Sequence, residues 1–201
     1  LKKYYKFYLE IGFVYKISKN INILDKTQNL FISYWKMLRI LANTKEDNLL
    51  ENEKEKKLFC SYLIKIPFEN IDLSYQNLTG ANLQGANLQK ANLQWADLQG
   101  ANLQGADLKW ADLQWADLEE VNLQWADLKW INLQMTNLRR ADLDWANLQE
   151  ADLRGANLQK AYLQRANLQD ANLQKAYLQE ANLQKANLNR TYGLKESKFF
   201  N

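Results

Sequence analysis

The sequence predicts a square solenoid of stacked coils, with a helical segment before it. Leucine returns at every fifth residue from 73 to 188, and alanine usually stands two residues before it. Leucine occupies the centre of all 24 pentapeptides between residues 71 and 190, and 19 of them begin with alanine. The residues before 66 follow a different pattern and predict helices.

A period of five suits neither a helix nor a flat strand. Five residues of α-helix turn the chain by about 500°, so the leucines would form no apolar stripe. In a strand, a step of five places successive leucines on opposite faces. A right-angle turn after each pentapeptide resolves this: four pentapeptides close one coil of twenty residues, and 24 pentapeptides make six coils. Residues two apart then point the same way, so Ala and Leu point inward and the other three positions outward.

The inward position before leucine departs from alanine in five pentapeptides. These residues are Ile71, Gln76, Val121, Ile131 and Thr136. Only Gln76 is an awkward inward residue, and it lies in the second pentapeptide, near the mouth of the solenoid. Phe68 holds the leucine register in "IPFEN", so we expect residues 66–70 to start the first coil.

These repeats resemble the pentapeptide-repeat family, whose motif is A(D/N)LXX, and in particular its bacterial and cyanobacterial members. The resemblance implies a mainly β fold: a right-handed quadrilateral parallel β-helix of about six coils, joined by backbone hydrogen bonds, here with an N-terminal α-helical segment. Repeat solenoids bury their core by stacking and need caps at their ends.

Residues 1–65 are expected to form a helical capping or interaction segment. Apolar residues have helical spacing in 27–43 and again in 47–65, and Pro67 stops the second helix. The simplest role is to cover the open strand edge at the mouth of the solenoid. A separate binding module and a helix on a membrane surface are the alternatives.

The solenoid is expected to span 66–190, and residues 191–201 to form a C-terminal cap. Gly193 stands where leucine is due, which ends the repeat. Phe199 and Phe200 either fold back over the last coil or meet a second chain, because related proteins often dimerise end to end. We favour the cap, with the C-terminal end as a candidate homodimer surface.

Charge is unevenly placed along the 201 residues, whose net charge is +3. Residues 1–70 carry 13 Lys/Arg and 8 Asp/Glu (+5), and 71–201 carry 13 and 15 (−2). The basic residues of 1–70 favour an acidic partner or the headgroups of a membrane, or they are simply a solvated surface. The single cysteine, Cys60, cannot form an internal disulfide, so nothing argues for an oxidising compartment. With no stretch of eighteen apolar residues and no signal-peptide pattern, a cytoplasmic location is expected.

No catalytic constellation is evident. The chain has no histidine, Cys60 lacks a histidine to activate it, and Cys/His metal-ligand spacing is absent. Asp107 and Asp127 lie one coil apart, but on an open face rather than in a pocket. We therefore expect no enzyme activity, no cofactor, no metal and no small-molecule substrate.

The last residue of each pentapeptide falls at an outward corner, and tryptophans gather there. Residues twenty apart share a column, so all six tryptophans of the repeat form vertical pairs. Stacking between coils is one explanation, and a partner-binding belt is the other. The candidate partner-binding residues are Tyr75, Trp95, Trp115, Trp110, Trp130, Trp125 and Trp145.

The function expected is a protein-binding scaffold with an unknown protein partner. The alternative is a DNA-mimicking inhibitor or protector of a type II topoisomerase, DNA gyrase, as the resemblance to quinolone-resistance members of the family implies. Such mimicry needs a strongly acidic rod, and Asp fills only eight of the 24 Asn/Asp positions here. Direct nucleic-acid binding lacks a positive groove, so neither nucleic acid nor membrane is the expected partner.

Overall fold

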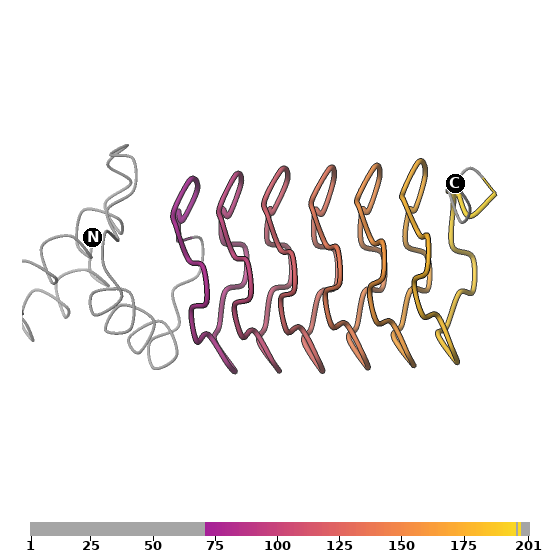
Figure 1. Ribbon diagram of the computed structural model, residues 1–201, viewed down its shortest axis with the longest axis horizontal. Helices are drawn as coiled ribbons and strands as arrows, with labels where there is room; N and C mark the ends of the chain where they lie inside the picture. Colours follow the sequence, from indigo (N-terminus) through magenta and orange to yellow (C-terminus); the bar gives the residue numbers. More distant parts are fainter. Residues whose placement is uncertain (1–70, 196, 198–201) are drawn as a thin grey trace, which may run out of the picture. The chain divides into compact units, whose positions relative to one another are not determined.

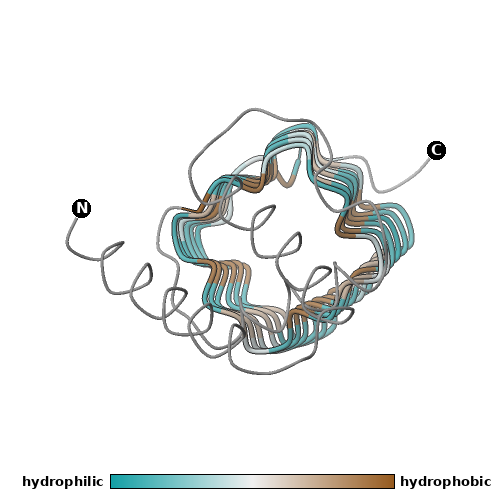
Figure 2. Cartoon of the chain, turned by 90° about the vertical axis from the view of Figure 1, so that its left-hand side faces the viewer, coloured by the Kyte–Doolittle hydropathy of each residue, from teal (hydrophilic) through white to brown (hydrophobic). Residues whose placement is uncertain are grey.

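The computed structural model describes residues 71–195 and 197, and these lie within one compact unit. They form a stack of similar coils that repeat every twenty residues (Figure 1). Seen along the stack, the coils superimpose as a four-sided outline (Figure 2). The predicted helices of residues 1–65, the boundary after residue 65, and the start of the first coil at 66–70 all lie outside the described residues.

Single bridge residues, rather than extended strands, join the coils. The Asn/Asp residue of each pentapeptide forms a parallel bridge with the residue twenty positions on, as Asp112 does with Asn132. The Leu113 N–H donates to the carbonyl of Asn132 at 2.8 Å, and the Trp115 N–H donates to that of Gln134 at 3.1 Å. No helix and no longer strand occurs in 71–195, because every side of five residues already contains a two-residue turn.

The corner turn explains why Asn or Asp precedes each leucine. In the pentapeptide 111–115, the turn closes when the Ala116 N–H donates to the Leu113 carbonyl at 3.0 Å. The Gln114 N–H has no backbone acceptor, and the Asp112 Oδ1 accepts it at 3.0 Å. A side chain that bonds the backbone two residues on is the usual role of Asn and Asp in turns. The motif residue therefore completes the hydrogen bonding of its own corner.

The core consists of the inward leucines and the small residues beside them. Every leucine from Leu73 to Leu178 is at most 2% exposed, so the inside of the coils is filled. Thr136 is satisfied because its hydroxyl donates to the Leu133 carbonyl at 2.7 Å. Gln76, the awkward inward residue of the sequence, is also buried, and its amide reaches the Ser74 carbonyl at 3.4 Å.

The stack loosens in its last coil. Leu183 and Leu188 are only half-buried, although the bridges continue as far as Tyr192. Gly193 has a φ of +75° and lies so close to the Gln174 backbone that no Cβ would fit there. The cap expected from Phe199 and Phe200 lies outside the described residues.

Candidate functional site

Every outward corner has a left-handed backbone. All 24 corner residues have positive φ, whether they are glycine, as at Gly105 with +65°, or tryptophan, as at Trp115 with +64°. This conformation costs an L-residue roughly 1–2 kcal/mol and is usually left to glycine, Asn or Asp. The aromatic residues share this cost with twelve other non-glycine corner residues, so the turn does not select for an aromatic side chain.

The first corner column carries three stacked aromatic rings. The ring centroids of Tyr75 and Trp95 are 6.3 Å apart, and those of Trp95 and Trp115 are 5.3 Å apart. The planes differ by 2° and 8°, so the three rings are nearly parallel. One coil further on, the Met135 sulfur lies over Gly155, where it fills the space a Cβ would need.

The other two aromatic columns hold one tryptophan pair each. Trp110 stacks on Trp130 with centroids 4.6 Å apart, and Trp125 stacks on Trp145 at 4.7 Å. The stacking predicted for vertical pairs is therefore confirmed. The parallel ring faces contact each other, so the columns present mainly ring edges to solvent.

Two cations contact the tryptophans of these columns. The guanidinium carbon of Arg165 lies 4.4 Å from the Trp145 ring centroid, and the Lys129 ammonium lies 5.5 Å from that of Trp130. Both distances are within the range of a cation–π interaction. Neither cation contact was predicted from the sequence, although Arg165 stands twenty residues after Trp145 and so shares its column.

The aromatic side chains are well exposed but do not form one patch. Tyr75, Trp110 and Trp125 are 58%, 55% and 57% exposed, and Trp130 alone among the seven is half-buried. They occupy three of the four corners of the square outline, over successive coils. A single flat partner therefore cannot cover all seven, and each column is a separate candidate contact.

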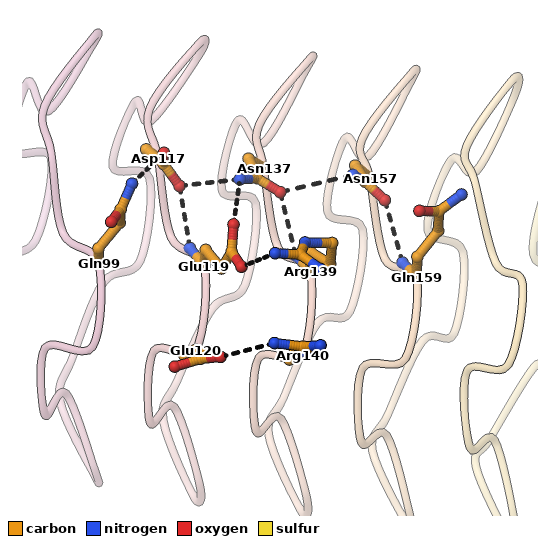
Figure 3. Close-up of polar contacts among 9 residues, drawn as sticks. All are labelled: Gln99, Asp117, Glu119, Glu120, Asn137, Arg139, Arg140, Asn157 and Gln159. Carbon is orange, nitrogen blue, oxygen red and sulfur yellow. Dashed lines mark hydrogen bonds and ion pairs between the residues drawn. The ribbon is translucent and has the colours of Figure 1, made fainter.

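The second corner column carries charge instead of aromatic rings. Arg140 lies 3.1 Å from Glu120, one coil away, and Arg139 pairs with Glu119 beside them (Figure 3). Further along, Lys160 lies 3.6 Å from Glu180. Exposed pairs of this kind are worth roughly 0–1 kcal/mol each. The second column thus displays ion pairs and no aromatic ring, whereas the other three columns carry aromatic stacks, and the fourth also holds an ion pair between Asp170 and Arg190.

Stacked aspartates are linked by a lysine rather than left as a bare acidic pair. The Lys109 ammonium lies 3.0 Å from an Asp107 carboxylate oxygen and 3.3 Å from one of Asp127. The hydrogen bond to Asp107 raises the pKa of Lys109, so this lysine is charged at neutral pH. Among residues 71–195 and 197, no three His, Cys, Asp or Glu side chains gather as a metal site would need.

One exception to the motif is repaired from the neighbouring coil. Tyr162 replaces the usual Asn or Asp, so the Gln164 N–H loses its turn acceptor. Asp144, one coil earlier in a position usually held by Gln, accepts that N–H at 2.7 Å. Burial raises the pKa of Asp144, although the hydrogen bond from Gln164 opposes this. This pair was not predicted from the sequence; the available signal was the two departures from the motif at Asp144 and Tyr162, eighteen residues apart.

In the part of the chain that the structure describes, there is no helix long and apolar enough to cross a membrane.

Comparison with solved structures finds other solenoids of the same repeat. HetL, a pentapeptide repeat protein involved in heterocyst differentiation regulation in the cyanobacterium Nostoc sp. strain PCC 7120, is 30% identical over 64% of this chain and 83% of HetL, with a TM-score of 0.28. Rfr23 from the cyanobacterium Cyanothece 51142 is 36% identical over 54% of this chain and 64% of Rfr23, with a TM-score of 0.24. QnrB1, a plasmid-mediated fluoroquinolone resistance protein, is 19% identical over 67% of this chain and 79% of QnrB1, with a TM-score of 0.39.

No curated protein matches the chain in a sequence comparison. A family model does match it, in eight copies and in overlapping segments that together run from residue 68 to residue 192. That model describes pentapeptide repeats, whose proteins form right-handed quadrilateral β-helices. The segments cover well over half of the 201 residues, and the twenty-residue coils agree with them. The chain belongs to the pentapeptide repeat family.

Proposed function

We propose that this chain is a non-enzymatic scaffold that binds a protein partner through its aromatic corner columns. The observation that carries the proposal is the placement of seven aromatic residues at left-handed corners, where glycine would serve the fold equally well. Exposed aromatic side chains of this kind dominate the energetics of many protein interfaces.

Magnitudes argue against a purely structural role for the stacks. A stacked aromatic pair contributes about 0.5–1.5 kcal/mol beyond the area it buries. A left-handed backbone costs each non-glycine residue about 1–2 kcal/mol. Relative to glycine, two tryptophans in a pair therefore gain little net stability from stacking, and other corners such as Glu120 and Arg140 bear the same backbone cost. The same corner is formed by glycine at Gly80, Gly85, Gly100 and Gly105, so the turn does not require an aromatic residue.

The test compares capture of partners from the native host by the intact chain and by three double variants. These are Trp95→Gln/Trp115→Gln, Trp110→Gln/Trp130→Gln and Trp125→Gln/Trp145→Gln, each checked for folding by circular dichroism. The matched control is Glu120→Gln/Arg140→Gln on the charged corner. We expect at least one tryptophan variant to lose a partner that the control retains, and the purified partner to show the same loss.

Capture that is equal for all four variants would overturn the proposal. It would move the site away from the aromatic columns. Capture of a type II topoisomerase, together with inhibition of DNA gyrase in a supercoiling assay, would instead favour the DNA-mimicking alternative.

The location and oligomeric state are also proposals. The single cysteine, Cys60, supports a cytoplasmic location, since the chain does not depend on an internal disulfide. The half-buried Leu183 and Leu188 of the last coil support the C-terminal end as a surface for a second copy. Sedimentation equilibrium of the full chain tests this, and a dimer that persists after Leu188→Gln would exclude that surface.

A further inference from the structure

The third corner column starts with an empty space and continues with an indole whose outer face is open. The column runs Gly85, Gly105, Trp125, Trp145, Arg165 and Lys185. A Cβ added at Gly85 or Gly105 would meet no atom within 4 Å. We call these two positions the Gly85–Gly105 gap.

Trp125 borders this gap. One face of its ring stacks on Trp145, with the planes 12° apart. Its other face looks along the column toward Gly105, and no ring or cation of the described residues covers it. Trp125 is accordingly 57% exposed. On this side, the aromatic stack therefore ends at a ring face that no other ring or cation of the described residues covers, next to an open corner.

The opposite end of the same column shows which group fits such a face. There the Arg165 guanidinium lies 4.4 Å from the Trp145 ring centroid. The Trp125–Trp145 spacing of 4.7 Å is close to one coil step, which is about 4.8 Å for neighbouring strands. A planar group placed at the level of Gly105 would therefore lie at stacking distance from Trp125.

Two carboxylates that can accept hydrogen bonds follow the corners of this column. Asp107 follows Gly105 by two residues, and Asp127 follows Trp125 by two residues. Lys109 lies within 3.3 Å of both carboxylates, and Lys129 follows Asp127 by two residues, so the two acids and the two lysines balance in charge. A guanidinium can stack on the indole and donate to a carboxylate in the same pose, because it is planar and carries five N–H donors. An ammonium lacks that planar face, and a neutral ring would gain nothing from the acids.

We propose that the Gly85–Gly105 gap receives an arginine side chain of the protein partner, with its guanidinium stacked on Trp125 and facing Asp107 and Asp127. This rests on the proposed function, because it names the chemistry by which one aromatic column would bind that partner. The second corner column supplies an internal comparison. It also begins with two open glycines, Gly80 and Gly100, but Glu120 follows them instead of a ring.

The test follows the indole N–H resonances of the ¹⁵N-labelled full chain during titration with N-acetyl-arginine amide. N-acetyl-lysine amide and N-acetyl-phenylalanine amide are titrated in parallel, to roughly 100 mM, because a single exposed cation–π contact is weak. Trp125→Gln assigns the resonance of Trp125. We expect arginine to shift this resonance several-fold more than either of the other two ligands, and more than it shifts the other indoles.

Two glycine variants make the test specific. Gly105→Trp extends the stack into the gap, and we expect it to fold, because the φ of Gly105, +65°, is close to the +61° of Trp125. Gly100→Trp is its matched control at the equally open corner of the second column. The arginine response should be lost in Gly105→Trp and retained in Gly100→Trp.

Equal responses to arginine and lysine, or an arginine response that survives Gly105→Trp, would overturn the inference. A larger response to the phenylalanine ligand would do so too, and would assign the gap to an aromatic side chain. Partner capture distinguishes a failure of this inference from a failure of the proposed function. If Trp125→Gln/Trp145→Gln loses the partner while Gly105→Trp keeps it, the aromatic column binds the partner but no arginine enters the gap.

Discussion

The second and third corner columns start alike and then diverge. Each begins with two glycines, and each then holds two large side chains one coil apart. In the second column these are Glu120 and Arg140, 3.1 Å apart as an ion pair (Figure 3). In the third they are Trp125 and Trp145, whose rings stack at 4.7 Å.

The backbone beneath both columns is the same. The Glu120 N–H donates to the next coil at 3.0 Å, and the Trp125 N–H does so at 3.2 Å. Their φ values are +58° and +61°. The difference teaches that the corner side chain is almost independent of the fold, so its chemistry is available for recognition.

The largest expected effect on stability comes from truncating the buried leucines beneath the two columns. Leu118 and Leu123 lie inside the coil beneath them and are 0% and 1% exposed. Leu118→Ala and Leu123→Ala should each lower the free energy of unfolding by about 2–5 kcal/mol, because each leaves a cavity in a filled core. Urea unfolding measures this. If Leu123→Ala, under the tryptophan column, lost much more unfolding free energy than Leu118→Ala, under the charged column, the tryptophan stack would be shown to stabilise the core.

A smaller effect is expected from converting one column into the other. Trp125→Arg/Trp145→Glu, which places the new carboxylate beside Arg165, should keep the fold and lower the free energy of unfolding by about 0.5–1.5 kcal/mol, the contribution of a stacked pair. The new ion pair would make stability fall as salt is added, which the parent column does not do. Urea unfolding at low and high salt checks both effects. A variant that fails to fold would contradict the independence of corner and backbone.

A still smaller effect tests the left-handed corner itself. Glu120→Gly should raise the free energy of unfolding by about 0.5 kcal/mol, because release of the left-handed strain exceeds the loss of an exposed ion pair and the added flexibility of the unfolded chain. Glu119→Gly is the control, since Glu119 does not have a positive φ and its replacement should destabilise. Thermal unfolding compares the two variants. Equal losses of stability in Glu120→Gly and Glu119→Gly would mean that the corner backbone carries no strain.

The smallest effect concerns the repaired corner beside the third column. Because burial raises the pKa of Asp144 above its ordinary value of 3.8, the folded chain holds this proton more tightly than the unfolded chain. The free energy of unfolding should therefore fall slightly as pH rises from the ordinary to the raised pKa, and then level off. Asp144→Asn keeps an acceptor for Gln164 but lacks this fall. Urea unfolding of both proteins from about pH 3 to about pH 7 measures the difference. If the free energy of unfolding of the two proteins had the same pH dependence, the raised pKa of Asp144 would be contradicted.

Part of the aromatic site was predictable from the sequence, because residues twenty apart lie at the same position of neighbouring coils. Residues twenty apart become neighbours, so the Trp125–Trp145 stack could be predicted from spacing alone. The Arg165 contact obeys the same rule and could have been found by it. The Asp144–Gln164 bond also joins residues twenty apart, but it becomes visible only once the turn is known to need an acceptor from residue 162.

The sequence by itself determined the square coil, its inward leucines and the columns of its corners. It could do so because a strict period of five leaves one way to bury Ala and Leu together, and each pentapeptide contacts only its neighbours. Only the tertiary structure decided the left-handed corner, the single bridge per side and the open face of Trp125 above Gly105. These three features depend on which acceptors the backbone N–H groups reach and on which atoms lie within 4 Å of each corner. The repeat pattern of the sequence specifies neither the acceptors nor these distances.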